Sequence, residues 1–96
     1  MERLFVYGTL RREGTARHFL RGSTFVGLGS IRGTVIQKNG YLGMIPGDTV
    51  VPGELFEISE ELFSRLDAYE GSGYARRLTE IEYEGEKIIA WVYWLT

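Results

Sequence analysis

The sequence predicts an α+β fold, a small and mostly antiparallel β-barrel with one or two flanking helices. Thirteen glycines separate short apolar runs, a pattern typical of the turns and bulges of a strand-rich domain. The run over residues 88–95 is apolar on both faces, so a strand there must be covered on both sides, as in a barrel. Only residues 59–71 show a clear helical pattern, with apolar residues at three- and four-residue spacing.

Length and composition predict one domain over residues 1–96, with a mass of 10.9 kDa. The apolar fraction of 44 % and the charged fraction of 25 % are ordinary for globular proteins and argue against disorder. No segment approaches the ~20 apolar residues of a membrane-spanning helix, and no signal-peptide pattern is visible. We therefore expect a cytoplasmic protein with no membrane partner, either a monomer or a homodimer.

The first half of the chain predicts strands separated by turns. Residues 3–7 are β-branched and aromatic in character and end at Gly8, which indicates a buried strand. Residues 15–20 predict a short helix. Residues 24–38 are strand-like but interrupted by glycines, which predicts one long bent strand or two short ones.

Two turn signals follow this segment. The Asn-Gly pair at 39–40 predicts a hairpin turn, and Pro-Gly-Asp at 46–48 predicts a second turn. Residues 50–58 resume a strand, in which the Pro-Gly pair at 52–53 indicates a bulge or an edge position.

The second half predicts one helix and then a hairpin. Ser59 suits the helix N-cap, and two glutamates follow it in the positively charged first turn. Gly71 is placed to end the helix. Residues 74–83 and 87–95 then predict two strands joined around a Glu-Gly-Glu turn.

Several classes of chemistry are excluded by residues that the chain lacks. The absence of cysteine excludes a disulfide scaffold, a thiolate metal site and a thiol nucleophile. A single histidine, His18, argues against histidine-rich metal sites and a Ser-His pair, and no serine lies in a Gly-x-Ser-x-Gly context. His18, beside Phe19, is more typical of a packing or capping residue than of a catalytic base. We expect no metal and no cofactor.

Charge is unevenly distributed along the chain. Residues 1–32 carry six arginines against two glutamates, a net +4, whereas residues 54–86 carry a net −7. An arginine cluster is one indication of nucleic-acid binding. However, the protein is acidic overall (pI ≈ 5.4), and no RNP-like aromatic pair or helix-turn-helix signal accompanies the arginines. We interpret them as a solvated basic face and expect no nucleic-acid partner.

The first predicted strand runs into Tyr7-Gly8-Thr9-Leu10. A glycine at a strand end lets the backbone turn sharply and expose successive amides, which can hold a carboxylate or stabilise an oxyanion. An ordinary strand-ending turn would show the same residues, so both interpretations stay open for this segment.

The end of the predicted helix carries acidic residues where a helix favours basic ones. Glu70 lies in the last turn, and the negative helix C-terminus, the like charge of Asp67 and partial burial between Tyr69 and Tyr74 would all raise its pKa toward neutrality. A general base benefits from such a pKa. A frayed helix end with solvated acids explains the same residues equally well.

Two arginines follow this helix end. A guanidinium from Arg76 or Arg77 would pair with Glu70, Asp67 or a substrate carboxylate. We expect one of the two arginines simply to face solvent.

Taken together, these motifs resemble the γ-glutamylcyclotransferase-like family, which includes AIG2-like proteins and γ-glutamylamine cyclotransferase. The resemblance is carried by YGTLRR, YLGMIPGD, VPGELFEI, LDAYEG with a following tyrosine and arginine, and AWVY, in that order over nearly the whole chain. It implies a small barrel with a pocket between the YGTL loop and the helix-end glutamate. It also implies that Glu70 is the catalytic residue. The implied substrate-binding residues are Tyr7, Gly8, Thr9, Leu10, Tyr74 and Arg76.

The resemblance implies cyclisation of a small γ-glutamyl amine or peptide to 5-oxoproline, with release of the amine. The substrate's own α-amine is the nucleophile, so no protein thiol, serine triad, metal or cofactor is required. Glu70 would act as general acid/base, and the backbone amides of the YGTL loop would stabilise the oxyanion. The alternative is a non-catalytic domain that binds a carboxylate or glutamyl-like ligand on the same scaffold.

Overall fold

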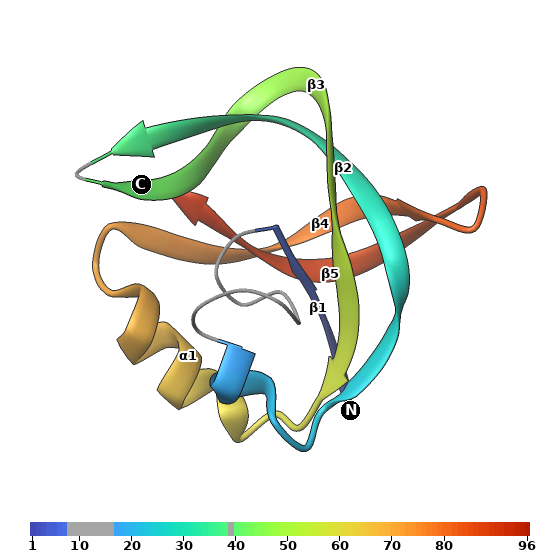
Figure 1. The fold of residues 1–96 in the computed structure, drawn as a ribbon, viewed down its shortest axis with the longest axis vertical. Coiled ribbons are helices and arrows are strands. Elements are labelled where there is room, and N and C mark those ends of the chain that lie inside the picture. Colours follow the sequence, from blue (N-terminus) through green and yellow to red (C-terminus); the bar gives the residue numbers. More distant parts are fainter. Residues whose placement is uncertain (8–16, 39) are drawn as a thin grey trace.

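The computed structural model describes residues 1–7, 17–38 and 40–96. Within these ranges, Figure 1 shows the helical segments together on one side of the strands. No helix in the described part of the chain has the length and apolar character needed to cross a membrane. The elements, in chain order, are β1 (Glu2–Val6), the 3₁₀ segment η1 (Arg17–Leu20), β2 (Thr24–Lys38), β3 (Tyr41–Ile58), α1 (Leu62–Glu70), β4 (Tyr74–Tyr83) and β5 (Glu86–Leu95).

The strands close into a barrel in the spatial order β1-β3-β2-β4-β5. Neighbouring strands are antiparallel except β1 and β5, which are parallel. Two of the strand pairings are short, with one residue pair each: Leu4 with Trp91 between β1 and β5, and Ser30 with Glu82 between β2 and β4. The predicted α+β fold, a mostly antiparallel barrel with flanking helices, is confirmed.

Strand β2 is one long strand, which is one of the two possibilities that the sequence predicts. In β3, by contrast, the turn predicted at residues 46–48 is wrong. Strand β3 continues through them, and its register against β2 shifts where Gly33 pairs with Thr49 and Thr34 pairs with Ile45. Residues 46–48 therefore form a bulge, because the chain on both sides of them pairs with the same strand. A Cβ at Gly47 would collide with the Thr34 side chain, so glycine suits this bulge.

The β4–β5 hairpin has the turn that its sequence predicts. Glu84 and Gly85 have φ values of 51° and 77°. Two successive residues with positive φ are typical of a type I′ turn, whose twist matches that of antiparallel strands. The turn fixes the register of the last two strands, from Tyr83 opposite Glu86 to Tyr74 opposite Leu95.

Helix α1 begins later than predicted. Its first residue is Leu62, and the N–H of Leu62 donates to the carbonyl of Ser59 at 3.1 Å. Ser59 is therefore not the N-cap, because a tight turn separates it from the helix. The predicted end is confirmed, since Gly71 follows the helix with φ 77° and its N–H donates to the Asp67 carbonyl at 2.9 Å.

The wall of the barrel separates two hydrophobic clusters, and β5 contributes to both. Val92 and Trp94 lie in one cluster, whereas Tyr93 lies in the other. This alternation explains why the strand is apolar on both faces. One cluster fills the barrel with Phe5, Ile31, Met44, Val51, Leu55, Ile81, Ala90, Val92 and Trp94. The other packs α1 and η1 against the wall with Leu4, Val6, Leu20, Phe56, Ile58, Phe63, Leu66 and Tyr93.

Candidate active site

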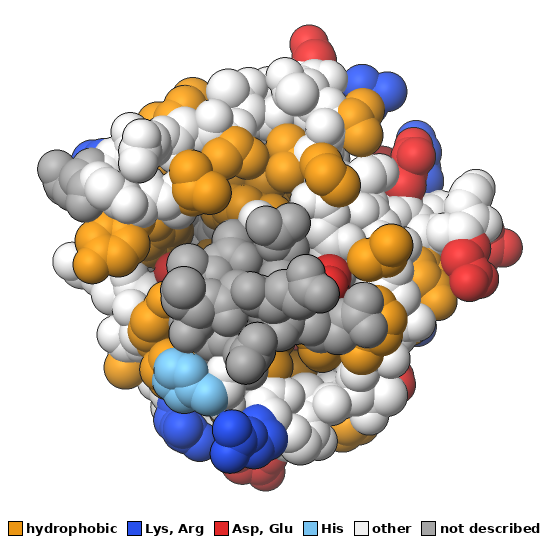
Figure 2. Space-filling model, viewed as in Figure 1, with side chains coloured by type: hydrophobic (Ala, Val, Ile, Leu, Met, Phe, Trp, Pro, Cys, Tyr) orange, Lys and Arg blue, Asp and Glu red, His pale blue; other side chains and the backbone are white. Residues whose placement is uncertain are grey.

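A cavity of about 430 Å³ lies where the end of β1, the tip of the β2–β3 hairpin and the end of α1 meet. Figure 2 shows hydrophobic side chains grouped on the upper part of one face, whereas most charged side chains lie toward its edge. Glu70 is the only carboxylic acid among the described lining residues. These residues are Phe5, Val6, Tyr7, Gly40, Tyr41, Leu42, Tyr69, Glu70, Tyr74 and Tyr93.

Glu70 is the last residue of α1 and is half-buried in this cavity. Burial raises the pKa of its carboxyl from 4.5 to about 7. The sequence led us to expect a contribution from the like charge of Asp67, and this expectation is wrong. The Asp67 carboxylate is paired with Arg76 and accepts a hydrogen bond from Tyr93.

Three tyrosines from three strands face Glu70. Tyr7 follows β1, Tyr74 begins β4 and Tyr93 lies near the end of β5. Burial raises the pKa of Tyr7 and Tyr74, and the negative charge of Glu70 raises both further. Burial and the hydrogen bond to Asp67 raise the pKa of Tyr93. The phenols therefore stay neutral at pH 7 and line the same cavity as the carboxyl.

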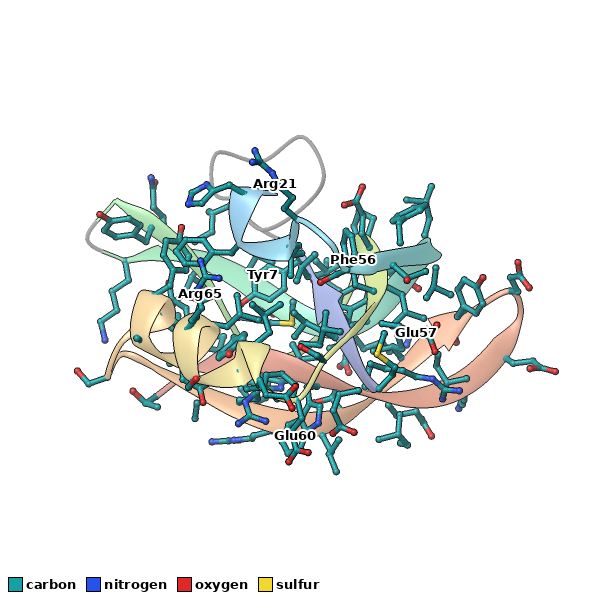
Figure 3. The ribbon with its side chains drawn as sticks, turned by 90° about the horizontal axis from the view of Figure 1, so that it is seen from below. Tyr7, Arg21, Phe56, Glu57, Glu60 and Arg65 are labelled. Atoms are coloured by element: carbon teal, nitrogen blue, oxygen red, sulfur yellow. The ribbon has the colours of Figure 1, made fainter. Side chains whose placement is uncertain are left out.

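The hydroxyls of these tyrosines join segments that are distant in sequence. Tyr7 donates to the Tyr93 carbonyl at 2.8 Å, and Tyr93 donates to the Asp67 carboxylate at 2.6 Å. Tyr74 donates to the Leu42 carbonyl at 2.7 Å, which ties the β2–β3 hairpin to β4 beside the cavity. In Figure 3, Tyr7 lies inside the molecule near α1, whereas Glu60 lies at the rim.

Arg76 is not among the described residues that line the cavity. Its guanidinium binds Asp67 through two hydrogen bonds, Nε to Oδ1 at 3.1 Å and Nη2 to Oδ2 at 3.2 Å. The same group lies 3.8 Å from the ring centroid of Phe63 and 4.4 Å from that of Trp91. Of the three partners that the sequence left open for an arginine here, the structure has Asp67. Arg77 is exposed.

The structure brings together Glu70, Tyr7 and Tyr74, three of the residues predicted for the site. Gly8, Thr9 and Leu10 lie outside the described residues. His18 is exposed and stacks on Phe19, with 4.5 Å between ring centroids.

Sequence reasoning did not assign seven of the described lining residues to the site, namely Phe5, Val6, Gly40, Tyr41, Leu42, Tyr69 and Tyr93. Tyr93 lies in an apolar run that we interpreted as core, and it is indeed buried, with 4 % of its surface exposed. Tyr41 and Leu42 directly follow the Asn-Gly pair and begin the YLGM motif. Their place in that motif is the feature of the sequence that could have indicated a role in the site.

The arrangement is suited to proton transfer at neutral pH. A carboxyl whose pKa is about 7 can both take up and return a proton there. Among the described residues, no three His, Cys, Asp or Glu side chains are grouped to hold a metal ion. The protein groups available for chemistry in the described lining are thus one carboxyl and several neutral phenols.

Comparison with known proteins assigns a family to this fold and site. The chain matches the family described as gamma-glutamyl cyclotransferase, AIG2-like, over residues 4–96, and it belongs to that family. It is 33 % identical to gamma-L-glutamyl-butirosin B gamma-glutamyl cyclotransferase of Niallia circulans, over 97 % of this chain and 66 % of that protein. It is 34 % identical to the gamma-glutamylcyclotransferase family protein YtfP of Escherichia coli K12, over 95 % of this chain and 80 % of that protein.

Solved structures share the fold. An uncharacterized protein from Pyrococcus horikoshii aligns with a TM-score of 0.79 and 28 % identity, over 99 % of this chain and 78 % of that one. An AIG2-like protein from Mus musculus aligns with a TM-score of 0.88 over 100 % of this chain and 78 % of that one. At 24 % identity, the mouse protein supports the fold alone. The family resemblance read from the motifs is confirmed.

Proposed function

We propose that this protein is a γ-glutamylcyclotransferase that converts a small γ-glutamyl amine or peptide to 5-oxoproline and a free amine. The observation that carries the proposal is Glu70, a half-buried carboxyl with a pKa of about 7 in a cavity lined by neutral phenols. Membership of the family supports the same chemistry. The relative from Niallia circulans carries this activity in its name, toward γ-L-glutamyl-butirosin B.

In the proposed reaction, Glu70 first acts as a base. The α-ammonium group of the substrate loses a proton to the Glu70 carboxylate, and the free amine attacks the side-chain carbonyl carbon of the same γ-glutamyl group. A carbon–nitrogen bond forms, and the carbonyl oxygen becomes an oxyanion. Holding the amine next to the carbonyl supplies the orientation that this cyclisation needs.

Glu70 then acts as an acid. The oxyanion collapses to a carbonyl, the bond to the leaving nitrogen breaks, and the protonated carboxyl gives its proton to that nitrogen. Glu70 thus takes up one proton and returns it, and ends as it began. The attacking nitrogen loses a second proton when the lactam forms, and this proton passes to the released amine, which leaves as an ammonium ion. Gly8, Thr9 and Leu10 remain in the proposal as the loop whose amides hold the oxyanion and the γ-glutamyl group.

The tyrosines are assigned to substrate binding. Tyr7 and Tyr74 stay neutral at pH 7, and both hydroxyls donate to carbonyls. The Tyr7 oxygen also has a hydrogen bond with the Met44 backbone, so the Tyr74 oxygen is the better placed of the two to accept another hydrogen bond. An ammonium group is a donor that suits such oxygens. Arg76, engaged by Asp67, would influence the site through that contact rather than by binding substrate directly.

The test is turnover of a panel of γ-glutamyl amines, γ-glutamyl amino acids and glutathione, with 5-oxoproline detected by mass spectrometry. Glu70→Gln should abolish product, because an amide cannot accept the proton. Glu60→Gln is the matched control, since Glu60 is exposed and does not line the cavity, and it should retain full activity. Undiminished activity in Glu70→Gln would remove Glu70 from the mechanism. Ligand binding without turnover would favour the non-catalytic binding domain.

A further inference from the structure

Arg76 reaches from β4 to two positions on one face of α1. Phe63 and Asp67 are four residues apart and therefore neighbours on the helix surface. The guanidinium lies over the Phe63 ring and forms a bidentate pair with the Asp67 carboxylate, the stronger type of charged contact. Trp91 of β5 also lies against the guanidinium, and its indole N–H donates to Glu2 of β1 at 2.9 Å. One cation thus connects α1 to the barrel wall.

Helix α1 has little stability of its own, and its position depends on packing against the barrel, where Phe63 and Leu66 are buried. It contains nine residues, lacks a side-chain hydrogen bond at its N-cap and has no basic residue in its last turn. Isolated helices shorter than about 12–15 residues are marginal in water. The place of its last turn therefore depends on contacts with the rest of the molecule.

The contact with Asp67 lies next to the proposed catalytic carboxyl. Glu70 is one helical turn beyond Asp67, and the Asp67 carbonyl accepts the N–H of Gly71, which ends the helix. The Asp67 carboxylate also accepts the Tyr93 hydroxyl, and the Tyr93 carbonyl accepts the Tyr7 hydroxyl. A displacement of Asp67 would therefore move both the acid/base and two phenols of the cavity.

We propose that Arg76 is a positioning residue that acts through Asp67 and Phe63 to hold the last turn of α1 against the barrel, so that Glu70 stays half-buried in the cavity. The inference rests on the proposed function of Glu70. The burial of the Glu70 carboxyl can nevertheless be measured whether or not the protein turns over a substrate. When the contact of Arg76 with Asp67 and Phe63 is lost, water reaches Glu70. The pKa of the Glu70 carboxyl then falls toward that of an exposed glutamate.

Two substitutions separate positioning from a simple effect of charge. Arg76→Met keeps an apolar side chain between the two rings but leaves the charge of Asp67 uncompensated, which by electrostatics alone would raise the pKa of Glu70. Asp67→Asn leaves the arginine uncompensated, which alone would lower it. Among the described residues, the other titratable groups that line the cavity are Tyr7 after β1, Tyr41 of β3, Tyr69 of α1, Tyr74 of β4 and Tyr93 of β5. The pKa values of Tyr7, Tyr74 and Tyr93 are raised, so these phenols stay neutral near pH 7.

The measurement is the pKa of Glu70 from ¹³C NMR titration of labelled glutamate carboxyls, assigned by comparison with Glu70→Gln. Positioning predicts a fall of about one unit or more in both variants. A rise or no change in Arg76→Met, or no change in Asp67→Asn, would overturn the proposal. Arg76→Lys keeps the positive charge and the aliphatic part of the side chain but loses the planar guanidinium that makes two hydrogen bonds to Asp67. It should fold and still lower the pKa, whereas an unchanged value would also count against positioning.

Turnover supplies a second readout. In Arg76→Lys we expect kcat to fall by about 10- to 100-fold, the scale of a small displacement of a reacting group. KM should change less, and the acidic limb of the kcat profile should move to lower pH. Glu80→Gln is the matched control, because it removes the exposed ion pair with Lys87 and should leave kcat and the Glu70 pKa unchanged. If the wild-type protein turns over no γ-glutamyl compound, the proposed function fails while the NMR titration still decides the inference.

Discussion

At the scale of single residues, the behaviour of Glu70 is decided by burial and not by its neighbour in sequence. Asp67 lies one turn earlier, and on an isolated helix its charge would repel a second carboxylate. In the folded protein, the hydrogen bonds from Arg76 lead the causes that hold the pKa of Asp67 below its ordinary value. Its negative charge is thereby offset. Desolvation is then the remaining cause of the raised pKa of Glu70.

Activity should depend on pH through this carboxyl. Glu70 acts as a base only when it is deprotonated, so kcat should fall as the pH drops below about 7, the pKa given by burial. The measurement is a pH–rate profile with the preferred γ-glutamyl substrate, supported by a titration of Glu70 itself. An acidic limb near 4.5, the pKa of an exposed glutamate, would contradict this assignment.

The same burial makes Glu70 costly to stability at high pH. Below 4.5 the carboxyl is protonated in both the folded and the unfolded protein, whereas above about 7 the folded protein must hold a half-buried charge. The stabilising effect of the raised pKa is therefore lost as the pH rises from 4.5 to 7. Glu70→Gln should raise the free energy of unfolding by about 1–3 kcal/mol at pH 8 relative to its effect at pH 4. Urea unfolding at the two pH values measures this, and equal effects would refute it.

At the scale of elements, β3 differs most from its prediction. Pro-Gly-Asp at 46–48 predicts a turn, and Pro-Gly at 52–53 predicts a bulge or an edge position within a strand. In the structure, β3 continues through both segments. At the second pair there is no bulge, because Ser30 pairs with Pro52 and Gly29 with Gly53 in regular register. The ladder with β1 extends only to Glu54, so Pro52 meets no β1 partner. The predicted bulge is therefore absent, whereas Pro52 pairs only with β2 among the residues that the structure describes, which suits proline.

Gly53 is explained by a close approach of β1. A Cβ there would collide with the Val6 carbonyl and approach the Phe5 ring to 2.5 Å, and neither can move without shifting β1. Gly53→Ala should therefore lower the free energy of unfolding by about 1–3 kcal/mol. Gly73→Ala is the control, since no atom lies within 4 Å of a Cβ at that position, and it should stay within about 0.5 kcal/mol of wild type. Equal effects in denaturant unfolding would rule out this explanation.

At the scale of the whole molecule, the cavity exists because segments from both ends of the chain meet at one end of the barrel. The end of β1, the β2–β3 hairpin, α1 and the β4–β5 hairpin each contribute lining residues. The Tyr74–Leu42 and Tyr7–Tyr93 hydrogen bonds join residues 32 and 86 positions apart. Such long-range contacts hold the site in one shape.

The bond from Tyr74 to Leu42 can be tested directly. Tyr74→Phe removes the hydroxyl but keeps the ring, so the hairpin tip loses its tie to β4. We expect the free energy of unfolding to fall by about 0.5–1.5 kcal/mol, the usual net worth of one hydrogen bond. Thermal or urea unfolding measures this change. Thr79→Val is a control that removes a hydroxyl elsewhere on β4, and it should not alter substrate KM, whereas Tyr74→Phe should raise it.

The sequence by itself determined the strand-rich fold, the boundaries of β2 and the end of α1 at Gly71. It also pointed to Glu70, because glycine positions, apolar runs and an acid at a helix end are local features. Only the tertiary structure decided that Asp67 is paired with Arg76, that residues 46–48 form a bulge and that Tyr93 lines a cavity. These outcomes depend on contacts between strands and a helix far apart in the chain. Local propensities carry no information about such contacts.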